Sequence, residues 1–400
     1  MIISFTVLKK ANLHWTFSKD QMQKIYYSAW LINNIELMNF GKNEVLKMDT
    51  VVVGTTQKED DSDRFDVLDR VLEDAGFWNT LEERFLSSGK TKKDFLVAVK
   101  PNLMMFSSKE DMSVITEPGL VEHLITKIAD KGYTNIALVE SQNVFGNWFK
   151  NREVENVAFH AGYRPTNYRI VDLTMDVVAY VYPGTLGTYL VGKTWKDADF
   201  RISFAKNKTH FSCYYTLTIK NIYGTTPEQN KFREYHADRE VNSVTIEMIK
   251  EFPAHFGIID GIWSADGLLG IKADFSPHHS KTIIAGSNII AVDIVGGQKM
   301  GIDPMKNSFV KLAIDTFGMP DINVKGDTSR YKDWKNVGPL VDWFLDHGEE
   351  LYGFSNLMGF MSSGMDEKAF PIKIKASNAT LALRSIVLST LRILNKGGII

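Results

Sequence analysis

ADFRISFAKNKTHFSCYYTLTIKNIYG, at residues 198–224, begins as a predicted strand and ends as a predicted helix. The apolar start at residues 201–205 is typical of a buried strand, and the later spacing of apolar residues indicates a helix that includes Thr216 and Lys220. We expect these two side chains, four residues apart, to share a helix face. The stretch also delivers other polar groups at or after the strand end: Lys206, Lys208, His210, Asn221 and Gly224.

The same alternation of strand and helix extends outward from this stretch. Short apolar runs at residues 50–55, 95–100 and 135–140 predict buried strands, and apolar residues at helical spacing occupy 64–75 and 116–131 between them. Strands separated by helices favour parallel pairing through right-handed crossovers. Similar patterns predict further strands at 169–173, 255–260 and 281–285, and helices at 151–162, 239–250, 289–300 and 308–317.

The predicted fold class is therefore α/β, with a mostly parallel sheet flanked by helices. Residues 177–191 alternate in polarity and contain Pro183, Gly184 and Gly187, which indicates an antiparallel hairpin insertion laid against the main sheet. We expect an N-terminal extension at residues 1–48, an α/β core at 49–322 and a C-terminal extension at 323–400.

The C-terminal extension ends in a predicted amphipathic helix at residues 377–395, which makes the extension helical. Leu381, Leu383, Ile386, Leu388, Leu391 and Ile393 are its apolar residues, and Arg384 and Arg392 are expected on its polar side. Such a helix packs against the protein body or a second subunit, or lies on a membrane surface. A homo-oligomer is one of the arrangements that the sequence leaves open.

Composition excludes several functional classes. The net charge of -2 gives no broad positive field, so we expect no nucleic-acid partner. The chain contains one cysteine, Cys213, which rules out an internal disulfide and a cysteine-ligated iron–sulfur cluster. No apolar run has the length of a transmembrane segment, and the N-terminus lacks the features of a signal peptide, so we expect a cytoplasmic protein.

Polar side chains gather where the predicted strands end, and ligands of parallel α/β sheets bind at this edge. Lys100, Lys206, Lys208 and Lys220 are expected to hold a small anion there, with Asn102 and Asn221 orienting it. His210 is a candidate acid or base, and Glu140 or Asp260 a metal ligand or second base. Thr216 shares a face with Lys220, and Gly224 lets a ligand or loop approach the backbone. The residues assigned to the site are Lys100, Asn102, Glu140, Lys206, Lys208, His210, Thr216, Lys220, Asn221, Gly224 and Asp260.

Three interpretations remain open at this point. The first is an enzyme or enzyme-like protein that binds a small anionic ligand. The second is a metal- or cofactor-binding module without turnover, and the third is a scaffold whose polar strand ends form a satisfied internal network. Asp293, inside the predicted helix at 289–300, is equally suited to a structural cap and to a site, because a buried carboxylate needs a partner.

Five segments taken in order resemble the domain-of-unknown-function 362 family, and together they extend over about residues 50–320. They are VAVKPNL (97–103), TEPGLVEHLITKIADKGYTNIALVES (116–141), KNKTHFSCYYTLTIKNIYG (206–224), FGIIDGIWSADGLLG (256–270) and AGSNIIAVDIVGGQKMGIDP (285–304).

This resemblance implies no general activity, and the cofactor stays unknown. Many members of the family carry ferredoxin-type cysteine clusters, which this chain lacks. The motif layout is also distantly similar to the N-terminal part of lactate racemase, where a strand-end histidine and lysine lie close to a nickel-bearing cofactor. That similarity implies His210 and Lys208 or Lys220 as candidates for proton handling or cofactor attachment.

Overall fold

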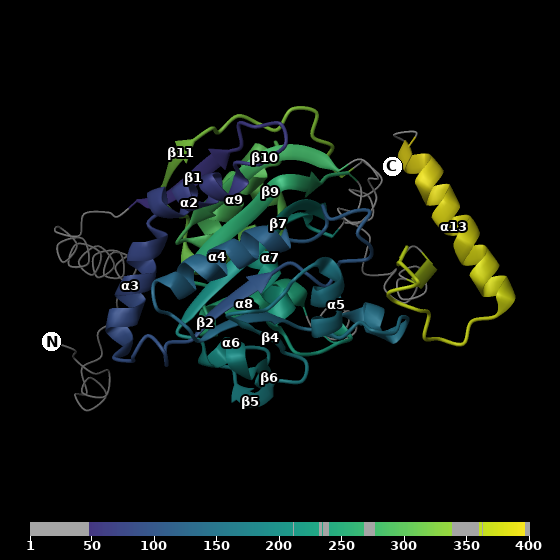
Figure 1. The fold of residues 1–400 in the computed structure, drawn as a ribbon, viewed down its shortest axis with the longest axis horizontal. Helices are drawn as coiled ribbons and strands as arrows, with labels where there is room; N and C mark the ends of the chain where they lie inside the picture. The colour runs from purple at the N-terminus through teal and green to yellow at the C-terminus, as the bar shows by residue number, and fades with distance from the viewer. Residues whose placement is uncertain are drawn as a thin grey trace, which may run out of the picture. The chain divides into compact units, whose positions relative to one another are not determined.

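A nine-stranded mixed sheet forms the centre of the protein in the computed structural model (Figure 1). The structure describes residues 48–210, 212–231, 234, 240–267, 277–337, 360–361 and 363–396. The predicted N-terminal extension lies outside these residues apart from Met48, and so does part of the predicted C-terminal extension.

The strands follow the order β11-β1-β10-β9-β7-β2-β3-β4, and β8 pairs with β7. Their bounds are β1 Asp49–Thr55, β2 Val97–Pro101, β3 Ile136–Glu140, β4 Arg169–Asp172, β7 Phe200–His210, β8 Tyr214–Thr216, β9 Phe256–Ala265, β10 His278–Gly286 and β11 Ile322–Gly326. Neighbouring strands are parallel except where β10 meets β1 and β9 and where β8 meets β7. This confirms the predicted mostly parallel α/β class.

Helices cover both faces of the sheet because its central strands are apolar on both sides. Val97 and Val99 face one hydrophobic core, which also contains α2, α3, α4 and α5, whereas Ala98 faces a second core with α7, α8, α9 and α10. Such alternation is expected of a strand buried between two helical layers. The helices are α2 Arg64–Asp74, α3 Phe77–Ser88, α4 Pro118–Asp130, α5 Val154–Ala161, α7 Thr218–Ile222, α8 Val241–Glu251, α9 Ile289–Lys299 and α10 Ser308–Phe317.

The predicted hairpin is present as a separate two-stranded sheet. Strands β5 (Val177–Val181) and β6 (Thr188–Gly192) pair antiparallel, and the short helix α6 (Lys193–Asp197) follows them. Val178, Tyr180 and Tyr189 pack against the second hydrophobic core. The insertion therefore contacts the body through side chains and adds no strand to the main sheet.

Strand β7 is longer than predicted, and this changes the position of the signature residues. Lys206, Lys208 and His210 lie within the strand, because β8 folds back on it and β9 runs beside it as far as Ala265. The predicted helix face shared by Thr216 and Lys220 is wrong. Thr216 belongs to β8, and α7 begins only at Thr218.

The turn between β7 and β8 contains the buried Cys213. Its thiol donates to the backbone oxygen of Tyr215 at 3.2 Å. Burial raises the pKa of the Cys213 thiol to about 11. The residue therefore behaves as a core side chain in the folded protein.

The C-terminal helix α13 (Asn378–Lys396) is present, but one predicted orientation is wrong. Arg384 is buried instead of lying on the polar side, because its guanidinium finds three oxygen acceptors, from Phe360, Ser363 and Glu367. No helix among the described residues is long and apolar enough to cross a membrane.

A lysine-rich cavity at the carboxyl edge of the sheet

A cavity of about 170 Å³ opens where β2 and β3 end, beside the second half of β7. We call it the lysine cavity. Strand β8, helix α7 and the short helix η3 (Tyr223–Thr225) complete its walls. Its lining residues are Lys100, Asn102, Met104, Met105, Glu140, Ser141, Asn143, Lys208, His210, Thr216, Lys220, Asn221, Tyr223, Gly224 and Lys231. Every predicted site residue except Lys206 and Asp260 is in this set.

Lys100 and Glu140 form a buried ion pair at the base of the cavity. The Lys100 ammonium donates to Glu140 Oε2 at 2.8 Å, to the Pro101 oxygen at 2.7 Å and to Asn221 Oδ1 at 3.2 Å. Burial lowers the pKa of Lys100, and the Glu140 carboxylate opposes this effect. All three ammonium protons have protein acceptors, so Lys100 supports the cavity and is not free to hold an anion.

Asn221 links this ion pair to the neighbouring strand. Its amide nitrogen donates to the Lys100 oxygen at 2.8 Å and to Ser203 Oγ at 3.1 Å. Because its Oδ1 also accepts from Lys100, the side chain is fully engaged with the protein. The sequence predicts that Asn221 orients a ligand. In the structure it positions Lys100 instead.

Gly224 allows the backbone to pass directly over the ion pair. A Cβ atom at this position would lie 2.6 Å from Lys100 Nζ and 2.8 Å from Glu140 Oε1. Ser141 Oγ donates to the Gly224 oxygen at 2.5 Å and fixes the approach. At Gly224 the backbone therefore lies close to the Lys100–Glu140 ion pair of the protein itself.

Lys208 enters the cavity from β7, and no carboxylate of the described residues pairs with it. Its ammonium donates to Asn102 Oδ1 at 2.9 Å and to the Val114 oxygen at 3.2 Å. Burial lowers the pKa of Lys208 to about 7, and the positive charges of Lys220, Lys206 and Lys100 add to the effect. Near neutral pH this amine is divided between its charged and neutral forms.

Two more lysines line the cavity without an ion pair among the described residues. Lys220 of α7 lies 5.4 Å from the ring centroid of Tyr223 and 5.5 Å from that of Phe309. It has no hydrogen bond or ion pair within the described residues, and burial lowers its pKa. Lys231 donates to the backbone oxygens of Gln142 and Glu228, and burial lowers its pKa to about 7. Sequence reasoning missed Lys231 because it lies beyond η3, in a segment with no strand-end signal.

His210 and Thr216 supply further polar groups. The backbone N–H of Ser212 donates to His210 Nδ1 at 3.1 Å, so the neutral ring carries its proton on Nε2. Thr216 is buried in β8, opposite Lys208. Its hydroxyl makes no hydrogen bond within the described part of the chain, which leaves a donor and acceptor at the cavity wall.

Lys206 and Asp260 form a second buried ion pair, which is not part of the cavity lining. Lys206 Nζ lies 2.9 Å from Asp260 Oδ2, and the same oxygen accepts from the backbone N–H of Glu117, the residue before α4. The two carboxylates proposed as metal ligands, Glu140 and Asp260, are thus held in two different ion pairs. The described residues contain no group of three or more His, Cys, Asp or Glu side chains arranged to hold a metal ion.

Asp293, which the sequence left open as either a structural cap or a site residue, is a structural cap. From α9, its carboxylate accepts from the backbone N–H of Thr218 at 2.7 Å and that of Ile219 at 3.0 Å, and from the Thr218 hydroxyl. These donors lie in the first turn of α7. Burial raises the pKa of Asp293 to about 7, against the effect of these hydrogen bonds. Asp293 fixes the helix that presents Lys220.

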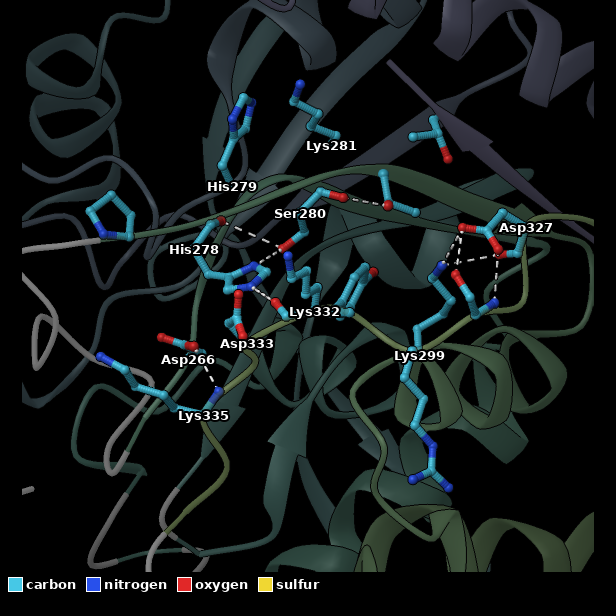
Figure 2. A pocket seen from close by; sticks show the side chains of 16 residues that line it. Asp266, His278, His279, Ser280, Lys281, Lys299, Asp327, Lys332, Asp333 and Lys335 are labelled. Atoms are coloured by element: carbon cyan, nitrogen blue, oxygen red, sulfur yellow. Dashed lines mark hydrogen bonds and ion pairs between the residues drawn. The ribbon is translucent and has the colours of Figure 1, made fainter. Parts of the chain in front are cut away.

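A second and larger cavity of about 590 Å³ lies near the ends of β1 and β9 (Figure 2). Its lysines are compensated or exposed: Lys299 pairs with Asp327 at 3.3 Å, and Lys281 pairs with Glu59 at 2.8 Å. Lys332 is exposed. The ion pairs and the exposure of these lysines distinguish this cleft from the lysine cavity, where Lys208, Lys220 and Lys231 are buried or half-buried and have no ion pair within the described residues.

Comparisons with known proteins agree with the family resemblance. The family model described as "Domain of unknown function (DUF362)" matches residues 97–298, a range that contains every lining residue of the lysine cavity. The thylakoid-associated protein sll1697 of Synechocystis sp. is 23% identical over 218 residues, which are 52% of this chain and 64% of that protein. The alignment thus spans less than two thirds of the relative's length.

A solved structure also matches, with a low structural similarity. The lactate racemase apoprotein from Thermoanaerobacterium thermosaccharolyticum superposes with a TM-score of 0.33 and 13% sequence identity. The match covers 60% of this chain and 54% of that one.

Proposed function

The chain belongs to the DUF362 family, and from this premise we propose that its lysine cavity binds a small anionic ligand. One observation carries the proposal. Lys208, Lys220 and Lys231 line the cavity without a carboxylate partner among the described residues, while the one lining carboxylate, Glu140, is paired with Lys100. Burying positive charges without compensation is costly, so an anion bound there would remove a penalty.

The size and the donors of the cavity favour a small ligand. Pockets for drug-sized molecules have volumes of about 300–1,000 Å³, whereas this cavity has about 170 Å³. Phosphate, sulfate and short carboxylates are of suitable size. Lysine ammonium groups and the Thr216 hydroxyl would together offer hydrogen-bond donors to their oxygen atoms.

Anion binding would also change the protonation of the cavity. A negative ligand favours the charged form of a neighbouring amine and raises its pKa. Lys208, whose pKa is about 7 without ligand, would then take up a proton as the ligand binds. The same amine is suited to exchange a proton with the ligand near neutral pH, which is the chemistry that an enzymatic role would use.

Titration calorimetry with sulfate, phosphate and short mono- and dicarboxylates tests this function. The wild-type chain is compared with the Lys220→Met variant, and Lys332→Met in the second cavity is the matched control. Losing a charged hydrogen bond costs about 1.5–3 kcal/mol, so we expect Lys220→Met to weaken binding at least about tenfold. Lys332→Met should bind like the wild type.

The competing interpretation, a scaffold with a satisfied polar network, predicts a different result. If no anion of the panel binds to the wild type, or if Lys220→Met binds as tightly as Lys332→Met, the proposed function is wrong. Circular dichroism of each variant checks that its fold is retained.

A further inference from the structure

Helix α13 is attached to the protein body by one of its faces. Leu381 and Val387 pack against the first hydrophobic core. Between them in sequence, Arg384 Nη1 lies 2.7 Å from Glu367 Oε1, and its other nitrogens donate to backbone oxygens. These contacts fix the rotation of the helix about its own axis and determine which residues point outward.

The opposite face of α13 is apolar and exposed. Leu383, Ile386 and Ile393 have exposed fractions of 53%, 62% and 69%. Spacings of three and seven residues place them in one stripe along the helix. The other exposed side chains between residues 378 and 390 are small or polar, and none of them is charged: Asn378, Ala379, Ala382, Ser385, Ser389 and Thr390. A helix face turned to water normally carries charged residues, and between residues 378 and 390 this face has none.

The segment that includes α13 carries positive charge only. Residues 368–400 contain Lys368, Lys373, Lys375, Arg384, Arg392 and Lys396, and no aspartate or glutamate. Lys373 and Lys375 are exposed just before the helix, and the Lys373 ammonium donates to the Gly146 oxygen at 3.2 Å. Arg384, in contrast, is neutralised by Glu367. An exposed apolar stripe with exposed basic residues next to it in the sequence is the pattern of a helix that lies on an anionic lipid surface.

Charge also argues against a second copy of this helix as the partner. Helix pairs gain specificity from opposite charges beside the apolar seam. Two copies of α13 would bring positive charges together without a carboxylate from either segment. An anionic surface, in contrast, complements the exposed Lys373 and Lys375 just before the helix.

We propose that the outer face of α13 binds the surface of a bilayer that contains anionic lipids. Leu383, Ile386 and Ile393 enter the boundary between headgroups and acyl chains, and Lys373 and Lys375 contact lipid phosphates. The helix lies parallel to the surface and keeps its inner contacts with the body. This proposal is independent of the lysine cavity and of its ligand.

Co-sedimentation of the full chain with vesicles tests the proposal. One set of vesicles contains phosphatidylcholine alone, and the other contains phosphatidylcholine with phosphatidylglycerol. We expect binding to the anionic vesicles that weakens with added salt, because the charge contribution is screened. The Ile386→Ser/Ile393→Ser variant should lose at least about tenfold in affinity, since buried apolar area supports binding.

Leu86→Ser is the matched control, because Leu86 is 70% exposed on α3, away from α13 in sequence. It should bind the vesicles like the wild type. Equal binding by the Ile386→Ser/Ile393→Ser variant, or no binding by the wild type, overturns the proposal. Sedimentation velocity without lipid completes the test: a dimer that this variant converts to monomer would identify a second copy as the occupant instead.

Discussion

Lys208 of β7 and Thr216 of β8 are directly opposite each other in an antiparallel pair, and both side chains line the lysine cavity. Opposite residues of such a pair project to the same side of the sheet. The hairpin therefore brings both groups to one wall of the cavity. The Lys208 amine has a lowered pKa, and the buried Thr216 hydroxyl has no partner among the described residues. Their arrangement depends on backbone pairing, which gives the cavity a rigid side.

The affinity of the cavity for an anion should fall as pH rises. Lys208 and Lys231 have pKa values of about 7 in the ligand-free protein, and a bound anion raises them. Between the free and bound pKa values, binding takes up protons, and each such lysine makes the Kd rise about tenfold per pH unit. Calorimetry with sulfate, whose own charge is constant from about pH 6 to about pH 9, measures this slope. A Lys208→Met variant should show a smaller slope, and a wild-type affinity that is independent of pH contradicts the prediction.

Replacing Glu140 by glutamine should strongly destabilise the protein. Glu140→Gln leaves the Lys100 ammonium buried without its counter-ion, and breaking a buried pair from one side costs about 3–5 kcal/mol. Urea denaturation followed by circular dichroism measures the free energy of unfolding. The double variant Lys100→Met/Glu140→Met removes both charges and should be less destabilised than Glu140→Gln. If Glu140→Gln unfolds like the wild type, the pair has no stabilising role.

An alanine at position 224 should not fit beneath the loop. Gly224→Ala places a Cβ 2.6 Å from Lys100 Nζ and 2.7 Å from Lys100 Cε, so the ion pair or the η3 backbone must move. Overpacking of this kind typically costs about 1–3 kcal/mol of stability. Thermal unfolding of Gly224→Ala is compared with that of Gly119→Ala on α4. At position 119 the Cβ would meet the far end of the Glu117 side chain at 3.2 Å, so the melting temperature of Gly119→Ala should stay near that of the wild type.

Asp293→Asn should loosen the start of α7. An asparagine retains only one accepting oxygen, so at least one backbone N–H, of Thr218 or Ile219, loses its partner. An unsatisfied buried donor costs about 1–3 kcal/mol. Hydrogen exchange at the amides of α7 should accelerate, and the exchange of α4 should not change. Unchanged protection in α7 would show that Asp293 does not cap this helix.

The raised pKa of Asp293 also makes the free energy of unfolding depend on pH. The folded-state pKa of about 7 lies above the ordinary value of 3.8. The contribution of a group with a raised pKa is complete below its unfolded pKa and is lost as pH rises through the folded value. In Asp293→Asn, the fall in stability between about pH 4 and about pH 7 should therefore be smaller than in the wild type.

Much of the architecture could be predicted because the buried strands are nearly continuous apolar runs. The runs at 95–100 and 135–140 correspond to β2 and β3, and the helical spacing at 116–131 to α4. The length of β7 could not be predicted, because its second half is polar and has the composition of a loop. Its polar side chains are buried only because other elements satisfy them: Asn207 donates to Ser264 at 2.8 Å, and Thr209 donates to the Gly267 oxygen at 2.7 Å.

The sequence predicts where the candidate site lies, but not what each of its residues does. Parallel strands end at one edge, so Lys100 and Lys208 were expected to lie near each other. Which lysine meets a carboxylate depends on side-chain pairing across 40 residues, as between Lys100 and Glu140, and no local pattern encodes it. The same limit applies to Lys231, which reaches the cavity from a segment that has no periodicity.

The turn between β7 and β8, beside the lysine cavity, contains a cysteine whose labelling reports on opening of the hairpin. Cys213 is the sole thiol of the chain, and in the folded state it is buried next to the hairpin that carries Lys208 and Thr216. An alkylating reagent can modify it only when this hairpin opens, since the reactive form is an accessible thiolate. The rate of labelling of the unmodified protein thus measures how often the wall of the cavity opens. A ligand that bridges the two strands would be detected as protection of a residue that it does not touch.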